Sequence, residues 1–328
     1  MSSGCLPGLS SVMLPRWRQP PYAPPMAPRA ASLQPTTIDP AALDLAALCL
    51  PPDAHKGSRG AAGILGGAPG MVGAAWLAGR AALHGGAGRV YVGQIDPAAP
   101  VVDPLYPELM LRRAEQLLAT DLPLTALVVG PGMGTAAPAA DLLAQALDTP
   151  LPLLLDADAL NLLARRADLT DRARARARST RVEHAAPTVL TPHPAEAARL
   201  LHTTVDAVAA DRPAAARALA ERYGAVAVLK GAGTLVAWFD AQGVRVVRNP
   251  TGSNRLATAG TGDVLSGLIG ALLARGLDAP TAAQLGVWVH GRAGELLPDE
   301  RPTASGLLAP LGRLLGPHTA ARSGLGQP

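Results

Sequence analysis

Short β-type runs alternate along this chain with Ala- and Leu-rich stretches of helical period, and this alternation restricts the fold more than any other feature. Strands that are separated by helices pair in parallel, so the pattern predicts an α/β fold with a doubly wound, mostly parallel sheet and helices on both faces. In such sheets ligands bind beyond the carboxyl ends of the strands. The predicted strands are Ala61–Leu65, Arg89–Val92, Ala126–Val129, Leu151–Leu155, Thr188–Leu190, Val226–Leu229 and Leu235–Trp238.

The predicted strands and helices belong to one domain, residues 39–316. Residues 1–38 hold repeated prolines and few periodic apolar positions, so they cannot bury enough surface to offset chain entropy, and we predict a disordered leader. Residues 317–328 are predicted to form a flexible tail. Aromatic residues make up only 3% of the chain against 48% hydrophobic residues, so the core must be built from Leu, Val, Ile and Ala.

Charge and cysteine content exclude several kinds of protein. A net charge of +4 over 328 residues argues for neither a nucleic-acid nor a membrane partner. Cys5 and Cys49 are the only cysteines, and neither has metal-ligand spacing, so we expect no disulfide framework and no protein-held metal. No apolar run approaches the roughly 18 residues of a membrane span. We therefore expect a cytoplasmic protein.

One basic segment interrupts the pattern between two predicted elements. Its arginines alternate with small residues, and no aromatic side chain lies between them to stack on bases. We expect a solvated surface insertion rather than a nucleic-acid patch. The arginines are Arg172, Arg174, Arg176, Arg178 and Arg181.

The sharpest motif is Gly260-Thr261-Gly262-Asp263, which opens a long apolar helical stretch. Gly260 and Gly262 let backbone N–H groups approach an anion, and a helix N-terminus adds a favourable partial positive charge for phosphate oxygens. Asp263 would then lie beside a transferred phosphoryl group and accept the proton of an attacking hydroxyl. An ordinary helix cap remains the alternative interpretation.

Two further glycine turns follow predicted strands. Lys230-Gly231-Ala232-Gly233-Thr234 could hold nucleotide phosphates with its amides and the Lys230 ammonium, although it lacks P-loop spacing and a plain β-hairpin is the alternative. Gly130-Pro131-Gly132-Met133-Gly134 would bring backbone close to a ligand, but such turns are also generic strand exits.

Polar side chains mark two other strand ends. Asp156 and Asp158 could orient substrate hydroxyls or bind Mg²⁺ through water, or Asp158 could simply cap the following helix. His193 lies between two prolines, which reduces the entropy cost of presenting its imidazole in one direction. The small residues of 63–75 would let a flat cofactor approach the backbone, although they do not form a dinucleotide fingerprint.

Taken in order, these motifs, preceded by His55-Lys56-Gly57, resemble the successive motifs of the ADP/ATP-dependent NAD(P)H-hydrate dehydratase family, a ribokinase-like group of cofactor repair enzymes. The resemblance covers about residues 43–300. It implies that Ala74, Gly132, Gly134, His193 and Asp263 contact the hydrated nicotinamide cofactor. The nucleotide-binding residues that it implies are Lys230, Gly231, Ala232, Gly233, Thr234, Gly260 and Gly262.

The resemblance also implies the reaction. Asp263 would deprotonate the hydroxyl of the S hydrate, the hydroxyl would take the terminal phosphoryl group of ADP or ATP, and departure of phosphate would restore NAD(P)H. Mg²⁺ would shield the transferring charge. The resemblance further implies a homo-oligomer such as a tetramer, and epimerisation of the R hydrate either by a separate protein or by slow uncatalysed exchange. Ala259 departs from the family's usual glycine. A ribokinase-like kinase of a thiazole or pyrimidine alcohol, or a nucleotide-binding regulator without turnover, would carry similar motifs.

Overall fold

The computed structural model describes residues 34–44, 57–118, 122–178, 186–299 and 302–315. By its internal contacts the chain divides into residues 1–34 and a compact unit from Pro35 onward, and the fold below is that of the compact unit. The predicted leader up to residue 33, the predicted tail, His55, Lys56 and Arg181 lie outside the described residues. The last residues of the predicted leader are structured, because Thr36 and Thr37 form a strand and Ile38 is buried.

A ten-stranded sheet forms the centre of this unit, and its strand order is β1-β10-β9-β8-β7-β6-β5-β2-β3-β4. Of the described strands β9 alone runs opposite to the rest. The predicted mostly parallel sheet is therefore confirmed. The strands are β1 Thr36–Thr37, β2 Ala61–Gly66, β3 Arg89–Gln94, β4 Met110–Arg113, β5 Ala126–Val129, β6 Leu153–Leu155, β7 Thr188–Leu190, β8 Val226–Leu229, β9 Leu235–Asp240 and β10 Gly243–Arg248.

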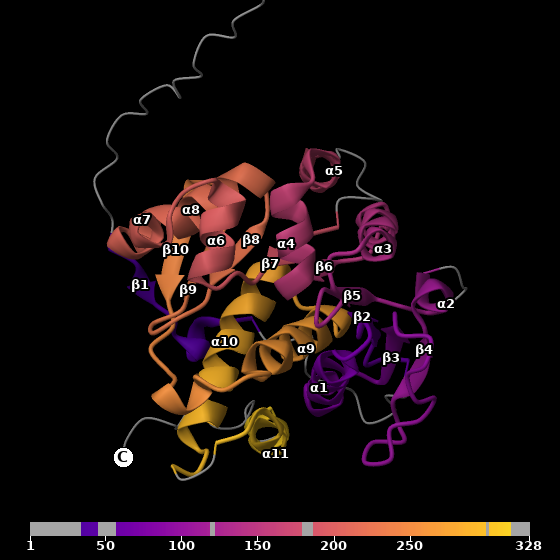
Figure 1. Cartoon of the computed structure of the whole chain (residues 1–328). Helices are drawn as coiled ribbons and strands as arrows, with labels where there is room; N and C mark the ends of the chain where they lie inside the picture. The colour runs from indigo at the N-terminus through magenta and orange to yellow at the C-terminus, as the bar shows by residue number, and fades with distance from the viewer. Residues whose placement is uncertain (1–33, 45–56, 119–121, 179–185, 300–301, 316–328) are drawn as a thin grey trace, which may run out of the picture. The chain divides into compact units, whose positions relative to one another are not determined.

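Helices cover both faces of the sheet, as the sequence predicts (Figure 1). One layer packs α1, α9, α10 and α11 on the sheet, and the other consists of the remaining helices. The helices are α1 Val72–His84, α2 Ala114–Leu118, α3 Ala137–Leu147, α4 Ala157–Arg165, α5 Ala167–Arg178, α6 Pro194–Leu201, α7 Val205–Ala210, α8 Arg212–Tyr223, α9 Thr261–Ala274, α10 Ala279–Glu295 and α11 Leu308–Leu314, with short 3₁₀ turns at Pro40–Ala42, Asn254–Leu256 and Ala304–Leu307.

Successive side chains along each strand point alternately into the two layers of the core. In β6, Leu154 belongs to the layer of α9, whereas Leu153 and Leu155 belong to the layer of α4. This is the period of two that a strand imposes on its side chains. Both faces are apolar because both are covered, which explains why the sequence shows short apolar runs instead of clean polar alternation.

Helix α9 lies against its neighbours at glycines. A Cβ on Gly267 would lie 1.9 Å from the carbonyl oxygen of Ala78 in α1, and one on Gly270 would lie 2.2 Å from a methyl carbon of Val128 in β5. Any side chain at these positions would force the backbones apart. The glycines therefore fix the depth at which α9 is seated, and with it the position of its N-terminus.

The strand order reverses between β2 and β5. From β2 the chain moves outward through β3 and β4, and it then returns to place β5 on the other side of β2. In doubly wound sheets such a reversal opens a crevice at the carboxyl ends of the two strands, where ligands bind. The glycine turns at residues 66–70 and 130–134 follow these two strand ends.

The basic segment matches the expectation of a solvated insertion only in part, because Arg172 and Arg178 are exposed whereas Arg176 is buried. Residues 167–178 form helix α5, and Arg176 is only 8% exposed. Its guanidinium donates to the carbonyl oxygens of Leu147, Thr149 and Leu151 and to the hydroxyl of Thr188. Carbonyl groups that follow the end of helix α3 need donors, and a guanidinium with five N–H groups supplies them.

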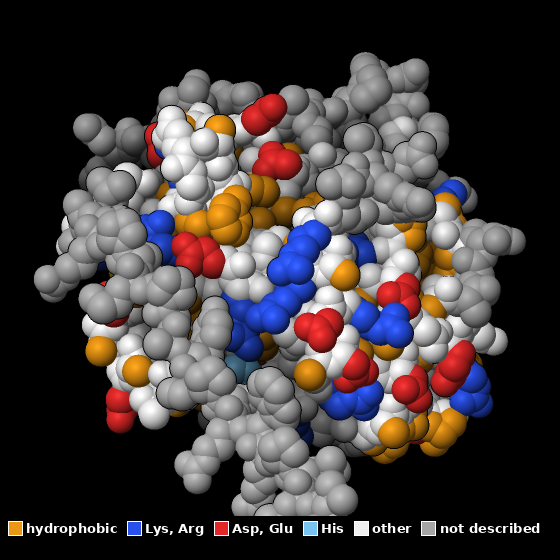
Figure 2. Space-filling model, turned by 90° about the horizontal axis from the view of Figure 1, so that it is seen from above, with side chains coloured by type: hydrophobic (Ala, Val, Ile, Leu, Met, Phe, Trp, Pro, Cys, Tyr) orange, Lys and Arg blue, Asp and Glu red, His pale blue; other side chains and the backbone are white. Residues whose placement is uncertain are grey.

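The surface of this unit has mixed charge on the face seen in Figure 2. Lys and Arg side chains gather in a line across the middle of that face, and Asp and Glu side chains lie on both sides of it. Across the described residues no helix is both long and apolar enough to cross a membrane.

We predict that Gly267→Ala destabilises the protein by about 1–3 kcal/mol, because its methyl group would displace the backbone of α1. Gly73→Ala is the matched control, because a Cβ there meets nothing within 4 Å and alanine favours a helix by up to about 1 kcal/mol. Urea denaturation measures both. Equal stability of the two variants would contradict the close contact of α9 with α1.

Candidate active site

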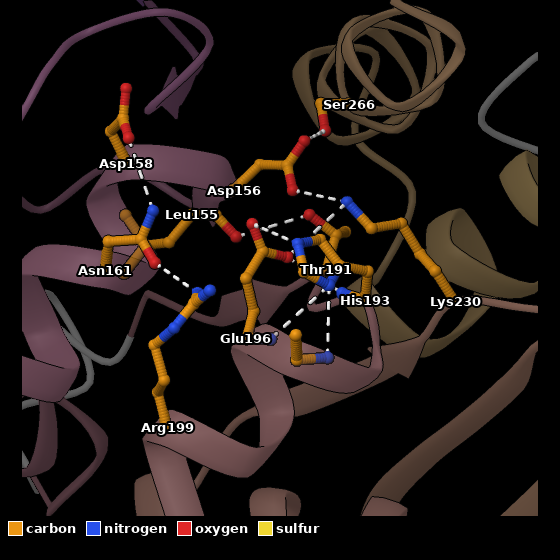
Figure 3. A network of polar contacts seen from close by, with 11 residues as sticks. Leu155, Asp156, Asp158, Asn161, Thr191, His193, Glu196, Arg199, Lys230 and Ser266 are labelled. Atoms are coloured by element: carbon orange, nitrogen blue, oxygen red, sulfur yellow. Dashed lines mark hydrogen bonds and ion pairs between the residues drawn. The ribbon is translucent and has the colours of Figure 1, made fainter. Parts of the chain in front are cut away.

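Three strand ends and one helix N-terminus meet at the carboxyl edge of the sheet (Figure 3). The backbone N–H of Lys230, after β8, donates to the carbonyl oxygen of Pro192, after β7, over 2.9 Å. A Cβ on Gly262, in the first turn of α9, would lie 3.5 Å from Lys230 Nζ. The motifs at residues 156–161, 191–196, 230–234 and 260–263 therefore form one site.

Asp156 joins two of these segments through its two carboxylate oxygens. Its Oδ1 accepts a hydrogen bond from Lys230 Nζ at 2.8 Å, and its Oδ2 accepts one from Ser266 Oγ at 2.7 Å. The residue is 1% exposed at the end of β6, and Ser266 is fully buried in α9. The next residue, Ala157, has a φ of 47°, a left-handed conformation that is costly for a residue with a side chain. This turn directs Asp156 toward α9.

A second carboxylate, Glu196, reaches the same ammonium. Its Oε2 lies 3.9 Å from Lys230 Nζ, and it is 5% exposed. Burial opposes the charge of Lys230, but the carboxylates of Asp156 and Glu196 outweigh it and raise the pKa of Lys230. Burial likewise raises the pKa of Glu196 to about 7, although the positive charge of Lys230 acts in the other direction. The pair is stable in a buried site because each charge has a partner.

Helix α9 presents its N-terminus to this cluster. Gly260 has a φ of 88° and a ψ of −9° at the helix cap, a conformation suited to glycine. The N–H groups of the first turn have no partners inside the helix and carry its partial positive charge. Asp263 lies in this first turn, beside the amides that could hold a phosphate.

The pKa of the Asp263 carboxyl group is raised toward neutral pH. Burial first, and then the negative charge of Asp156, raise its pKa to about 7, although Lys230 partly opposes both effects. Asp263 is partly buried, and the charges of Asp156, Lys230 and Asp158 all act on its carboxyl group. A carboxyl group that titrates near pH 7 can act as a general base in the physiological range.

The glycine turn after β5 faces the beginning of α1. Gly132 has a φ of 59°, and a Cβ there would lie 3.0 Å from the Cβ of Ala74 and 2.5 Å from the carbonyl oxygen of Met71. The backbone N–H of Gly134 donates to Asp158 Oδ2 at 2.9 Å. The residues predicted to contact the substrate, Ala74, Gly132 and Gly134, are therefore neighbours at the crevice between β2 and β5.

Asp158 supports this turn and does not cap its helix. Helix α4 begins at Ala157, so Asp158 is already inside the first turn. Its other oxygen accepts a hydrogen bond from Asn161 Nδ2, and Asn161 Oδ1 accepts one from Arg199 Nη1 at 2.6 Å (Figure 3). This series of hydrogen bonds fixes the position of the Asp158 carboxylate, which accepts the hydrogen bond from Gly134.

His193 has a structural task in addition to any contact with a ligand. It caps helix α6, and its Nδ1 accepts hydrogen bonds from the backbone N–H groups of Ala195 and Glu196. In the neutral imidazole the proton must then be on Nε2, which lies 3.4 Å from Glu196 Oε1. Burial lowers the pKa of His193, and Lys230 and Arg199 lower it further. The His193 side chain is 47% exposed.

The turn between β8 and β9 is both a hairpin and part of the site. The two strands pair antiparallel, as in the alternative interpretation of the sequence. Thr234 Oγ1 donates to the carbonyl oxygen of Gly231, and the guanidinium of Arg212 donates to the carbonyl oxygens of Leu229, Lys230 and Ala232. These bonds hold the turn while its Gly231 and Gly233 adopt positive φ angles.

Sequence reasoning missed three residues that complete the site. Glu196 follows His193 at the spacing of a capping box, a signal that was present in the sequence. Ser266 is a lone hydroxyl within an apolar helix, which indicates a buried hydrogen bond without naming its partner. Arg212 lies 18 residues before Lys230 and is brought to it only by the packing of α8.

The donor set does not form a complete Mg²⁺ site. Within the described part of the chain, no group of three or more His, Cys, Asp or Glu side chains is arranged to hold a metal ion. Asp156 and Glu196 already neutralise an ammonium. Mg²⁺ is usually held by one or two carboxylates together with substrate phosphates, so any such ion would depend on a nucleotide for its ligands.

A Gly-x-Gly-Asp helix terminus at the carboxyl edge of a doubly wound sheet places this chain in the ribokinase-like class of α/β proteins. A family model described as NAD(P)H-hydrate dehydratase matches residues 62–312. The chain belongs to this family. The ADP-dependent (S)-NAD(P)H-hydrate dehydratase of Neisseria meningitidis serogroup B is 44% identical over 260 residues, which cover 78% of this chain and 83% of that protein.

Other relatives extend the comparison. The bifunctional NAD(P)H-hydrate repair enzyme Nnr of Escherichia coli is 39% identical over 284 residues, which cover 83% of this chain but 50% of that protein. The solved structure of the ADP/ATP-dependent NAD(P)H-hydrate dehydratase from Bacillus subtilis, co-crystallised with ATP/Mg²⁺, is 28% identical and superposes with a TM-score of 0.71, covering 86% of this chain and 98% of that one.

We predict that Asp263→Asn raises the melting temperature, and that the gain grows from pH 5 to pH 8. Because the folded pKa of about 7 is above the ordinary 3.8, the folded protein keeps a proton that the unfolded chain loses, so this group's contribution to stability falls as pH rises from about 4 to 7. An asparagine side chain does not ionise, so the variant does not lose this stability as pH rises. The exposed Asp141→Asn on α3 is the control, and a gain that stayed constant with pH would contradict the buried carboxyl.

Proposed function

We propose that this protein dehydrates the S form of NAD(P)H hydrate with ADP or ATP, regenerating NAD(P)H and releasing phosphate with AMP or ADP. Asp263 carries the proposal, because it combines a position beside first-turn amides with a carboxyl group that titrates near neutral pH. Membership of the dehydratase family supports the same conclusion.

In the proposed reaction Asp263 accepts the proton of the hydrate's hydroxyl group. The hydroxyl oxygen forms a bond to the terminal phosphorus of the nucleotide, and the bond from that phosphorus to the leaving nucleotide breaks. First-turn amides of α9, at Gly262 and Asp263, stabilise the charge on the transferring phosphoryl group. The carbon–oxygen bond to the new phosphate then breaks with the help of the ring nitrogen's electron pair, and loss of a ring proton restores the dihydronicotinamide.

Two neighbouring regions would bind the two substrates. We assign the adenine nucleotide to the turn 230–234 and to Gly260 and Gly262, because a Cβ on Gly262 would lie 3.5 Å from Lys230 Nζ. We assign the nicotinamide hydrate to the crevice between β2 and β5, with Ala74, Gly132 and Gly134 at its wall and His193 at its rim. The assignment is supported by the strand reversal at that crevice.

The remaining assignments follow the family. We propose that Mg²⁺ enters as a complex with the nucleotide, since the residues that the structure describes contain no group of three or more acidic, His or Cys side chains that could hold it. We also propose a cytoplasmic homo-oligomer that works with a separate epimerase for the R hydrate. Size-exclusion chromatography with light scattering would test the oligomer.

We predict that Asp263→Asn lowers kcat for the S hydrate by about 10²–10⁴-fold, because it removes the general base and leaves its shape. In the wild type, kcat/KM should fall as pH drops below about 7, since the base must be ionised to accept a proton. Recovery of dihydronicotinamide absorbance measures both. Asp141→Asn should match the wild type. A variant at position 263 with near wild-type kcat would rule out Asp263 as the base.

The products distinguish this enzyme from a ribokinase-like kinase. The dehydratase should release inorganic phosphate and NAD(P)H in equal amounts, whereas a kinase would leave a stable phosphate ester of an alcohol. Incubation of the protein with prepared hydrate and each nucleotide, followed by phosphate assay and absorbance, decides between them. Binding of nucleotide without phosphate release would indicate a regulator.

A further inference from the structure

Lysine is rare in this chain. Lys56 and Lys230 are its two lysines among 29 basic residues, so nearly every other cation is an arginine. At position 230 the ammonium lies between Asp156 Oδ1 at 2.8 Å and Glu196 Oε2 at 3.9 Å, and its side chain is 19% exposed. A compact ammonium with three donors fits between two carboxylates where a planar guanidinium would need a wider gap.

Asp156 is the member of this cluster that reaches α9. One oxygen holds Lys230 at the start of the turn 230–234, and the other accepts the hydroxyl proton of Ser266, three residues after Asp263 in the same helix. Residues three apart lie on neighbouring positions of one helical face. The buried carboxylate therefore bridges the turn assigned to the nucleotide and the helix that carries Asp263.

We propose that Asp156 is a positioning residue that holds the turn 230–234 and helix α9 at a fixed separation, so that Lys230 and Asp263 act on the same phosphoryl group. The inference rests on the proposed function and extends it. Asp156 itself does not touch the substrate in this scheme. It acts through two bonds that no other described side chain duplicates, because the Ser266 hydroxyl has Asp156 as its partner and Glu196 lies farther from Lys230.

Two substitutions test the bond of Asp156 to Lys230 and its bond to Ser266 individually. Asp156→Asn keeps the shape but removes the charge that pairs with Lys230, whereas Ser266→Ala removes only the bond to α9. Asp103→Asn is the matched control. Asp103 is also fully buried and pairs with a cation, Arg80, at 2.7 Å, but it lies in the connection between β3 and β4.

The two lysines allow a direct readout of the cluster. Protein labelled with ¹³C-lysine gives signals from two side chains, and Lys230→Met assigns them. Asp156→Asn should make the Lys230 ammonium titrate at a lower pH than in the wild type, because two carboxylates, Glu196 and Asp263, then oppose the effect of burial instead of three. Ser266→Ala and Asp103→Asn should leave that titration unchanged.

We expect Asp156→Asn to lower kcat about 100-fold, since a displacement of about 1 Å at reacting groups has an effect of this size. Ser266→Ala should lower kcat about 10-fold, with a smaller change in KM for ADP. Asp103→Asn should lower the urea midpoint and leave kcat and KM unchanged. Wild-type kcat in both Asp156→Asn and Ser266→Ala would overturn the proposal. If Asp156→Asn does not fold, kcat of Ser266→Ala decides.

Failure of the proposed function gives a different result from failure of the positioning role of Asp156. If the wild type restores no NAD(P)H from the hydrate, the dehydratase assignment fails. The bridge is then tested by titrating ADP against the Lys230 signal in the wild type and in Ser266→Ala. A weaker ADP dissociation constant in the variant supports the bridge, and equal constants overturn it.

Discussion

A buried carboxylate that shares its two oxygens between an ammonium and a hydroxyl is the constraint on which the site depends. A charge inside a protein is tolerated only when its partners replace the water that it lost. Asp156 meets this condition with Lys230 from the end of β8 and Ser266 from the middle of α9. Removing either partner would leave an oxygen unsatisfied, so the ends of β6 and β8 and the helix α9 are coupled energetically as well as spatially.

The fold could be predicted from the sequence because its main signals are local. Apolar runs of strand length between Ala- and Leu-rich stretches predict the inner strands, and β2, β5, β7 and β8 lie where the pattern places them. The strands β4 and β10 were missed, because they lie near the edges of the sheet and carry exposed charged residues such as Arg112 and Arg245. Edge strands lack the apolar runs of buried ones.

The site was predictable only where one segment contains the whole signal. The turn at Gly260 and the carboxylate at Asp263 follow from a glycine motif at a helix start, and their place beside Lys230 is what the structure adds. The bond from Ser266 to Asp156 spans 110 positions, and only tertiary packing creates it. The same holds for Arg176, whose burial depends on carbonyl groups outside its own helix, whereas the exposed Arg172 and Arg178 fit the predicted solvated segment.

The contact of α9 with α1 through Gly267 has a consequence for how ligands are received. Where backbone meets backbone, a helix has no side chains whose rotamers could adjust, and the interior of a protein resists compression. In the proposed function, the amides at residues 262 and 263 would therefore be oriented for the phosphate before the nucleotide binds. Association with such a rigid receptor loses little conformational entropy, so the main cost of capture is stripping water from the anion and from the amides that receive it.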